Sequence, residues 1–304
     1  IMRAQILSYS EQRNFRLGLL FAFGGTALFA LKSIFIKLAY AQGVDTVTLL
    51  TLRMLVAAPF YLAVFLWLLY KTKVTRPAKQ DFLAIIVLGA MSYYASSYFD
   101  MQGLNYISAQ LERLMLYTYP LMTAVLGWFL FKEVITPRIL LALVLTYSGV
   151  LLLYAFEAKL GGNHVGLGVV LVTLSALIFA VYLVYSKRVL NRVDSRLFTS
   201  IAMLSATTWV FIHFLLTHPL SALSVNSSAW FYALLLGLFS TVLPSFMLTE
   251  AVARIGAARA SIMGTAGPII TIVLAVIFLD EPFGWAHLVG MLLVIIGVSF
   301  LNKK

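Results

Sequence analysis

The chain has 304 residues, of which 62% are hydrophobic and 11% charged, and its mean hydropathy is +0.97. Soluble domains average about 25% charged residues, so this composition excludes a soluble globular domain. The net charge is +11, cysteine is absent, and the four histidines have no metal-ligand spacing. These features exclude disulfides and thiolate chemistry, and they predict neither a metal site nor a cofactor.

Apolar runs between polar breaks predict an all-α polytopic membrane protein with ten spans. Continuous apolar runs such as Leu292–Ile296 exclude the alternating pattern of a transmembrane β-barrel. The first span follows a basic segment but is too long for the apolar region of a cleaved signal peptide, so we expect a retained anchor. The predicted spans lie near residues 17–38, 46–69, 82–103, 108–130, 139–156, 165–187, 196–216, 229–251, 256–278 and 286–301.

The lysines and arginines are distributed unevenly around these spans. Seventeen of the 22 fall on the side that holds the N-terminus, four fall within spans, and Lys159 alone falls on the opposite side. The positive-inside rule therefore predicts that both termini are cytoplasmic, in a bacterial inner membrane. Because orientation accounts for the net charge, we expect no nucleic-acid partner.

The chain resembles itself at an offset of 148 residues, which aligns 81–152 with 229–300 without a gap. This predicts two repeats, residues 1–156 and 157–304, with five spans each. Because five is odd, the second repeat enters the membrane from the opposite side, and inverted repeats are typical of secondary transporters. The coinciding residues include Gly89 and Gly237, Pro120 and Pro268, Glu133 and Glu281, Gly149 and Gly297 and, at offsets of 149 and 150 respectively, Asp45 and Asp194, Phe29 and Phe179.

The second repeat is similar to the EamA-type repeat of the drug/metabolite transporter superfamily at Ala257–Ser261, Pro268, Phe278–Pro282, Gly290 and Ile296–Val298. The first repeat resembles it at Ala109, Pro120, Phe131–Glu133 and Ser148–Val150, but has Ala142 and Val134 in place of a glycine and a proline. The resemblance implies a ten-helix exporter of small metabolites. Four helices of each repeat would surround a central cavity, and the fifth would support them. In general likeness the chain is most similar to bacterial exporters of aromatic amino acids.

Ionisable residues within the spans point to the transport path. Lys32 and Arg53 lie about four residues, or about 6 Å, from the midplane toward the external face. A charge at a lipid-exposed helix centre costs about 2.5–3.5 kcal/mol, so such residues commonly serve a function. We expect both to face a substrate carboxylate. The alternative is structural: a salt bridge to Asp100 or Glu112, or snorkelling.

Aromatic and hydroxyl side chains gather at mid-depth. Tyr94, Ser97 and Tyr98 share one face of the third span at i, i+3 and i+4, where they could stack on and hydrogen-bond a planar solute. Packing or interface anchoring is the open alternative. The remaining candidates are Tyr117 and Tyr119 in the fourth span, Tyr182 in the sixth and Trp209 in the seventh.

Two prolines, Pro120 and Pro268, lie close to the centres of the fourth and ninth spans. Each removes a backbone hydrogen bond and favours a kink. Because the positions are equivalent across an inverted repeat, we expect paired gating points beside the cavity. Static bends are the alternative.

These features predict a secondary transporter that exports small metabolites, with amino acids including aromatic ones as the expected substrates. Broad efflux of cationic drugs is one alternative, but it calls for an acidic residue near a helix centre, and the sequence offers none. An intramembrane enzyme is the alternative from another class, and only a serine paired with Lys32 approaches a catalytic constellation. We therefore expect no enzyme and no cofactor. The expected partners are a small-molecule substrate, membrane lipid and, as a candidate coupling ion, protons.

Overall fold

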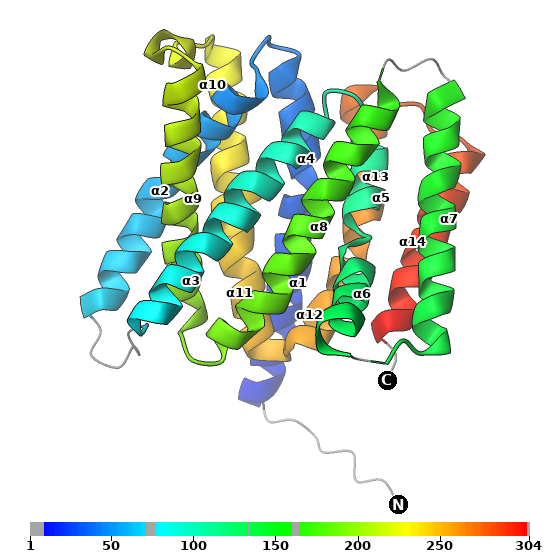
Figure 1. The fold of residues 1–304 in the computed structure, drawn as a ribbon, viewed down its shortest axis with the longest axis horizontal. Coiled ribbons are helices and arrows are strands. Elements are labelled where there is room, and N and C mark those ends of the chain that lie inside the picture. Colours follow the sequence, from blue (N-terminus) through cyan, green and yellow to red (C-terminus); the bar gives the residue numbers. More distant parts are fainter. Residues whose placement is uncertain (1–8, 71–76, 133, 160–163, 303–304) are drawn as a thin grey trace, which may run out of the picture.

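The computed structural model describes residues 9–70, 77–132, 134–159 and 164–302, and Glu133 of the repeat lies outside them. Within these ranges the chain is helical, contains no strand, and forms a bundle of roughly aligned helices (Figure 1). The first repeat comprises α1 (Tyr9–Tyr40), α2 (Thr46–Tyr70), α3 (Lys79–Gly89), η1 (Ala90–Ser96), α4 (Ser97–Gly103), α5 (Ala109–Leu116), α6 (Tyr119–Phe131) and α7 (Pro137–Lys159). The second comprises α8 (Val165–Leu190), α9 (Ser195–Thr217), η2 (Leu220–Leu223), α10 (Ser227–Gly237), η3 (Leu238–Val242), α11 (Leu243–Ile255), α12 (Ala257–Gly264), α13 (Ala266–Leu279) and α14 (Trp285–Asn302).

Seven helices of the described chain are long and apolar enough to cross a membrane. They correspond to the predicted first, second, third, fifth, sixth, seventh and eighth spans. The predicted fourth and ninth spans each divide into two shorter helices, α5 with α6 and α12 with α13. The apolar stretch of α14 is also short, at Trp285–Phe300. The all-helical membrane class is thus confirmed. Of the three remaining predicted spans, two are divided by a break and the last has a short apolar stretch, so none of them counts among the seven long helices.

Equivalent helices of the two repeats run in opposite directions. α1 begins at the end of the bundle where α14 finishes, whereas α8, the counterpart of α1, begins at the other end (Figure 1). α1 packs against α11 and α13, and α8 packs against their counterparts α4 and α6. The first helix of each repeat therefore lies against the third and fourth spans of the other, as an inverted repeat requires.

Close backbone approaches follow the same symmetry. A Cβ atom at Gly89 would lie 2.3 Å from the carbonyl oxygen of Ala202 on α9. A Cβ atom at Gly237, the counterpart of Gly89, would lie 3.1 Å from the carbonyl oxygen of Arg53 on α2, and Arg53 is the counterpart of Ala202. Glycine at both positions lets the helices approach closely.

The fifth helices of the repeats, α7 and α14, pack against each other. A Cβ atom at Gly149 would lie 2.6 Å from the Gly290 carbonyl oxygen, and one at Gly297 would lie 3.0 Å from the Ala142 carbonyl oxygen. Gly297 and Gly290 are the repeat counterparts of Gly149 and Ala142, so this crossing is itself symmetric.

Departures from regular helix also recur at the repeat offset. The π-helical segments η1 and η3 begin 148 residues apart, at Ala90 and Leu238. Pro120 is the second residue of α6 and Pro268 the third of α13, each directly after a break in its span. Proline is tolerated in a first turn because its missing N–H has no intrahelical acceptor there. Each span is therefore interrupted before its proline, in place of the predicted kink in a continuous helix.

The second helix of each repeat begins at an equivalent aspartate. Asp45 accepts backbone hydrogen bonds from Val47 at 2.9 Å and Thr48 at 3.0 Å, and Asp194 accepts one from the Arg196 N–H at 2.9 Å. Such N-caps satisfy amides that lack an intrahelical partner. Burial raises the pKa of Asp45, but the hydrogen bonds from Thr48 and Val47 outweigh this effect and the pKa is lowered.

Candidate substrate site

A cluster of buried polar side chains joins α1, α4 and α5. Lys32 Nζ lies 2.6 Å from Asp100 Oδ2 and 3.5 Å from Glu112 Oε1. The Ser33 hydroxyl donates to the other carboxylate oxygen of Glu112, Oε2, at 2.6 Å. All four residues are at most 9% exposed. The structural alternative left open by the sequence, a salt bridge from Lys32 to Asp100, is therefore present in the structure.

Two carboxylates share this single ammonium group. Asp100 Oδ1 and Glu112 Oε1 are buried and accept no hydrogen bond from the described residues. An unsatisfied buried acceptor loses its hydration without compensation, at a cost of about 1–3 kcal/mol and more for charged groups. These two oxygens are places where water, a proton or a substrate amine can bind.

The second predicted cation, Arg53 of α2, is 4% exposed and contacts the second repeat. Its Nε donates to Thr241 Oγ1 at 2.8 Å. Thr241 belongs to η3, and its hydroxyl donates to the Leu236 carbonyl oxygen at 2.8 Å. π-Helical insertions frequently mark functional sites. Arg53, a buried cation of the first repeat, thus contacts an irregular segment of the second.

A third buried cation, Arg113, follows Glu112 on α5 and is 7% exposed. Its guanidinium carbon lies 5.8 Å from the centre of the Tyr117 ring. A Cβ atom at Gly267 of α13 would lie 3.0 Å from Arg113 Nη2, so glycine leaves room there for the guanidinium group. Among the described residues, no carboxylate lies within 4 Å of Arg113, and its buried Nε has no acceptor.

We name five residues the charged core: Lys32, Arg53, Arg113, Asp100 and Glu112. Three cations and two carboxylates leave one formal positive charge in excess. All five come from the first repeat. The aligned positions of the second repeat hold only uncharged residues, namely Tyr182, Ala202, Ser261, Leu248 and Ala260. The backbone is nearly symmetric, but the charge of the interior is not.

The predicted aromatic face of the third span is present in the structure. The rings of Tyr94 and Tyr98 both meet His213 of α9 edge to face, with centroid distances of 5.8 and 5.1 Å. Ser97 is partly buried beside them. Because the contact spans α4 with η1 on one side and α9 on the other, the face lies between the two repeats.

The remaining aromatic candidates divide into two groups. Tyr119 meets Phe179 at 5.1 Å, Phe179 stacks on Tyr182 at 5.6 Å, and Tyr182 meets Tyr93 at 5.8 Å, all between ring centroids. Tyr117 packs on Arg113. Trp209 is 44% exposed and makes no ring contact within the described part of the chain. The structure therefore brings Tyr119 and Tyr182 together and leaves Trp209 apart.

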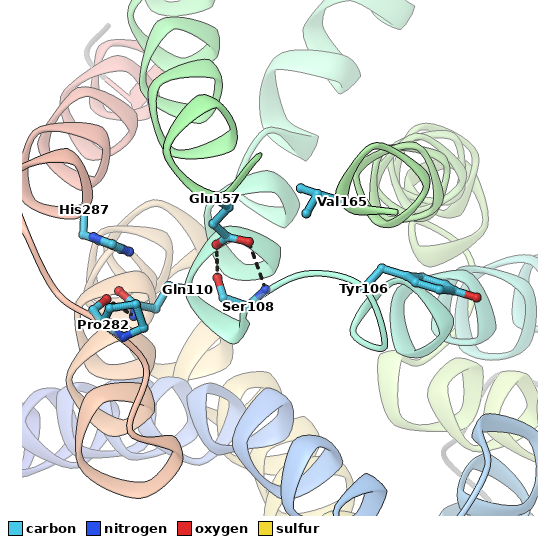
Figure 2. A pocket seen from close by; sticks show the side chains of 7 residues that line it. All are labelled: Tyr106, Ser108, Gln110, Glu157, Val165, Pro282 and His287. Carbon is cyan, nitrogen blue, oxygen red and sulfur yellow. Dashed lines mark hydrogen bonds between the residues drawn. The ribbon is translucent and has the colours of Figure 1, made fainter. Parts of the chain in front are cut away.

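Two carboxylates hold the N-terminus of α5, the helix that carries Glu112 and Arg113. Glu157 of α7 accepts hydrogen bonds from the Ser108 N–H at 3.2 Å and from its hydroxyl (Figure 2). Glu281 accepts one from the Ala109 N–H at 2.7 Å. Negative charge at a helix N-terminus is favourable. These contacts fix the helix that presents two members of the charged core.

A pocket of about 220 Å³ opens beside this helix start, at the end of the bundle where α7 finishes and α8 begins (Figure 2). Ser108 on its wall is one helical turn from Glu112 along α5. The pocket thus opens at the start of the helix that carries Glu112 and Arg113. Its lining residues are Tyr106, Ser108, Gln110, Glu157, Val165, Pro282 and His287.

Sequence reasoning did not select three residues that the structure places at the site. Phe179 carried a signal, since it is the repeat counterpart of Phe29. Arg113 is one of the four lysines and arginines within the predicted spans. Neighbours on a helix do not face each other, so the sequence predicts different partners for Arg113 and Glu112, but which helix Arg113 faces depends on how α5 is rotated. Thr241 lies in a predicted continuous helix, and the sequence does not predict the π-helical segment η3 from which its side chain contacts Arg53.

Comparison with known proteins places this arrangement in a family. The chain matches the EamA-like transporter family over residues 16–155 and again over 166–303. It is 30% identical to the uncharacterized transporter YcbK of Bacillus subtilis (strain 168), over 100% of this chain and 98% of that protein. It is 25% identical to the uncharacterized transporter YetK of the same organism, over 83% of this chain and 78% of that protein. A solved crystal structure with 19% identity has the same fold, with a TM-score of 0.66 over 93% of this chain and 95% of that one. The chain belongs to the EamA-like transporter family and is a multi-pass membrane transporter.

Proposed function

We propose that this transporter exports small metabolites that carry a carboxylate, amino acids including aromatic ones among them, across the bacterial cytoplasmic membrane. The observation that carries the proposal is the charged core, in which three buried cations outnumber two carboxylates and only Lys32 is paired with them. Excess buried charge is costly unless it is paired. A substrate carboxylate would supply the missing negative charge, whereas a cationic drug would increase the excess.

The proposed site combines this charge with the aromatic residues around it. Asp100 Oδ1 and Glu112 Oε1, which accept no hydrogen bond from the described residues, could each accept one from a substrate ammonium group. Protons would compete for the same oxygens, which makes them the candidate coupling ion. The proposed substrate-binding residues are Lys32, Arg53, Tyr94, Ser97, Tyr98, Tyr117, Tyr119 and Tyr182. Trp209, which lies apart from these, is proposed from the sequence alone.

Transport is proposed to proceed by alternating access between the two repeats, 1–156 and 157–304. In this proposal the chain crosses the membrane ten times, with α5 and α6 forming one crossing, α12 and α13 another and α14 the last. Both termini are cytoplasmic. The antiparallel course of α1 and α8 and their exchanged packing support an inverted arrangement. The excess of lysine and arginine on one side supports the orientation.

Single cysteines in this cysteine-free chain test the orientation. Ser228 at the start of α10 and Asn191 after α8 are exposed at opposite ends of the bundle. We expect Ser228→Cys to react with a membrane-impermeant maleimide in intact cells, and Asn191→Cys to react only after permeabilisation. Labelling of Asn191→Cys in intact cells would contradict the proposed topology.

Purified protein in liposomes tests the substrate class. We expect saturable uptake of labelled aromatic amino acids above that of protein-free liposomes, measured with and without a pH gradient. A response to the gradient would identify protons as the coupling ion. If aromatic amines without a carboxylate are carried in preference to amino acids, the drug-efflux alternative replaces this proposal.

A further inference from the structure

Arg113 is a buried cation that the described protein leaves without a counter-ion. Lys32 is paired with Asp100, and Arg53 donates to Thr241. Arg113 is 7% exposed, yet its Nε has no acceptor and no described carboxylate lies within 4 Å. Arginine cannot escape this cost by losing its proton, because the guanidinium group stays protonated in proteins.

The neighbouring acid does not neutralise Arg113 by direct contact. Consecutive residues of a helix point in directions about 100° apart. Glu112 turns toward α1, where it accepts from Ser33 at 2.6 Å and faces Lys32 at 3.5 Å. Arg113 turns toward α13 and lies over the Tyr117 ring. The side chains of Glu112 and Arg113 therefore lie in different surroundings.

Small residues of the second repeat make room for the guanidinium group. A Cβ atom at Gly267 would lie 3.0 Å from both Arg113 Nη2 and the Tyr117 hydroxyl oxygen, and one at Gly264 would lie 3.8 Å from that hydroxyl. At the aligned positions of the first repeat stand the larger Tyr119 and Leu116. Glycine at 267 thus makes room for a charged group at the seam between the repeats, where both interrupted spans break.

We infer that Arg113 binds the carboxylate of the transported substrate, with Tyr117 against the guanidinium face and the Gly264 and Gly267 side of the second repeat opposite. This inference rests on the proposed function, and it assigns carboxylate recognition to Arg113 in place of Lys32. The planar guanidinium group offers five donors, and its geometry matches the two oxygens of a carboxylate. Phosphate shares this chemistry, so a phosphate monoester is the comparison ligand.

Binding is measured without transport, by the thermal unfolding midpoint of the purified protein in a detergent free of anionic lipid. The probes are the aromatic amino acids, 3-phenylpropionate, the amides of these compounds, and phenyl phosphate. We expect the acids to stabilise the wild type and the amides not to. Arg113→Gln should raise the Kd for the acids about tenfold or more, because a hydrogen bond to a charged group contributes about 1.5–3 kcal/mol. Arg113→Lys keeps the charge but loses the planar set of donors, so its Kd for the acids should lie between those of the wild type and Arg113→Gln.

Two further variants keep the test decisive. Gly267→Val leaves Arg113 in place but fills the space beside its Nη2, and it should weaken acid binding even if Arg113→Gln fails to fold. Lys187→Gln, which removes an exposed cation near the end of α8, should bind as the wild type does. Unchanged Kd values in folded Arg113→Gln or Gly267→Val, or equal stabilisation by acids and amides, would overturn the inference. Preference for phenyl phosphate over every acid would replace the carboxylate with a phosphate.

The outcome is separable from that of the proposed function. If liposomes containing the wild type and Arg113→Gln take up amino acids equally well, the inference fails and the proposed function stands. If acid binding depends on Arg113 but no amino acid is transported, the anion site stands and the proposed substrate is wrong.

Discussion

Replacing Asp100 with asparagine is expected to lower the free energy of unfolding by about 3–5 kcal/mol and to abolish transport, because it removes one partner of a buried ion pair. Asp100 is 3% exposed and Lys32 Nζ lies 2.6 Å from it. Without the Asp100 carboxylate, Glu112, at 3.5 Å, is the one counter-ion that the described residues leave to the ammonium group. The measurement is denaturant unfolding of the purified protein in mixed micelles, together with liposome uptake.

A surface ion pair provides the control. Glu250 and Arg254 are 2.6 Å apart on one face of α11, and both side chains are partly exposed. Exposed pairs contribute about 0–1 kcal/mol, so Glu250→Gln should change the free energy of unfolding by no more than that. A comparable loss in Asp100→Asn and Glu250→Gln would show that the buried pair has no special importance for stability.

The triple variant Lys32→Met, Asp100→Leu and Glu112→Gln removes the ammonium group together with both carboxylates that share it, and so separates folding from transport. Replacing a buried ion pair with apolar residues of similar size is often neutral or stabilising, so we expect most of the lost stability to return. Transport should stay absent if the pair belongs to the substrate site. Lys32→Gln alone cannot make this distinction, because it also strips Asp100 of its counter-ion. Recovery of transport along with stability would assign the pair a structural role only.

The helical membrane class could be predicted from the sequence because a bilayer imposes long apolar runs. The repeat offset of 148 residues also carried structural information, since it relates η1 to η3 and the break before Pro120 to the break before Pro268. The breaks themselves were not predicted. An apolar run such as 108–130 has the same composition whether its helix is continuous or interrupted, and packing against other helices decides between the two.

The candidate site, too, could be predicted only in part, because packing between helices decides which side chains meet. Depth along a helix follows from position in the sequence, so Lys32, Asp100 and Glu112 could be named as a group with an ion pair as one alternative. Which alternative holds depends on helix rotation, because a side chain moves about 100° around the axis with each residue. Arg113 shows this most clearly. It is one residue from Glu112, yet it faces another helix and another chemical environment.

Replacing Pro120 or Pro268 with alanine is expected to shift the resting conformation in opposite directions. Alanine restores the N–H that proline lacks and removes the ring clash, so each break can close into a continuous helix. Alternating access in an inverted repeat exchanges the conformations of the two halves. Straightening the α5–α6 span therefore favours one of the two conformations, open to the outside or open to the cytoplasm, and straightening the α12–α13 span favours the other. A bias of about 1 kcal/mol would change the ratio of the two states about fivefold.

The readout is the rate of thiol labelling at Ser97→Cys and Ser245→Cys, which stand at equivalent positions, 148 residues apart, and are both partly buried. We expect Pro120→Ala to raise the rate at one position and lower it at the other, and Pro268→Ala to reverse the pattern. Pro219→Ala, in the exposed loop before η2, should change neither. Because only a paired gate makes two equivalent substitutions act oppositely, shifts in the same direction would identify the breaks as static features of the fold. No shift with normal transport would have the same meaning and would place gating in other segments, of which η1 and η3 are the next symmetric pair.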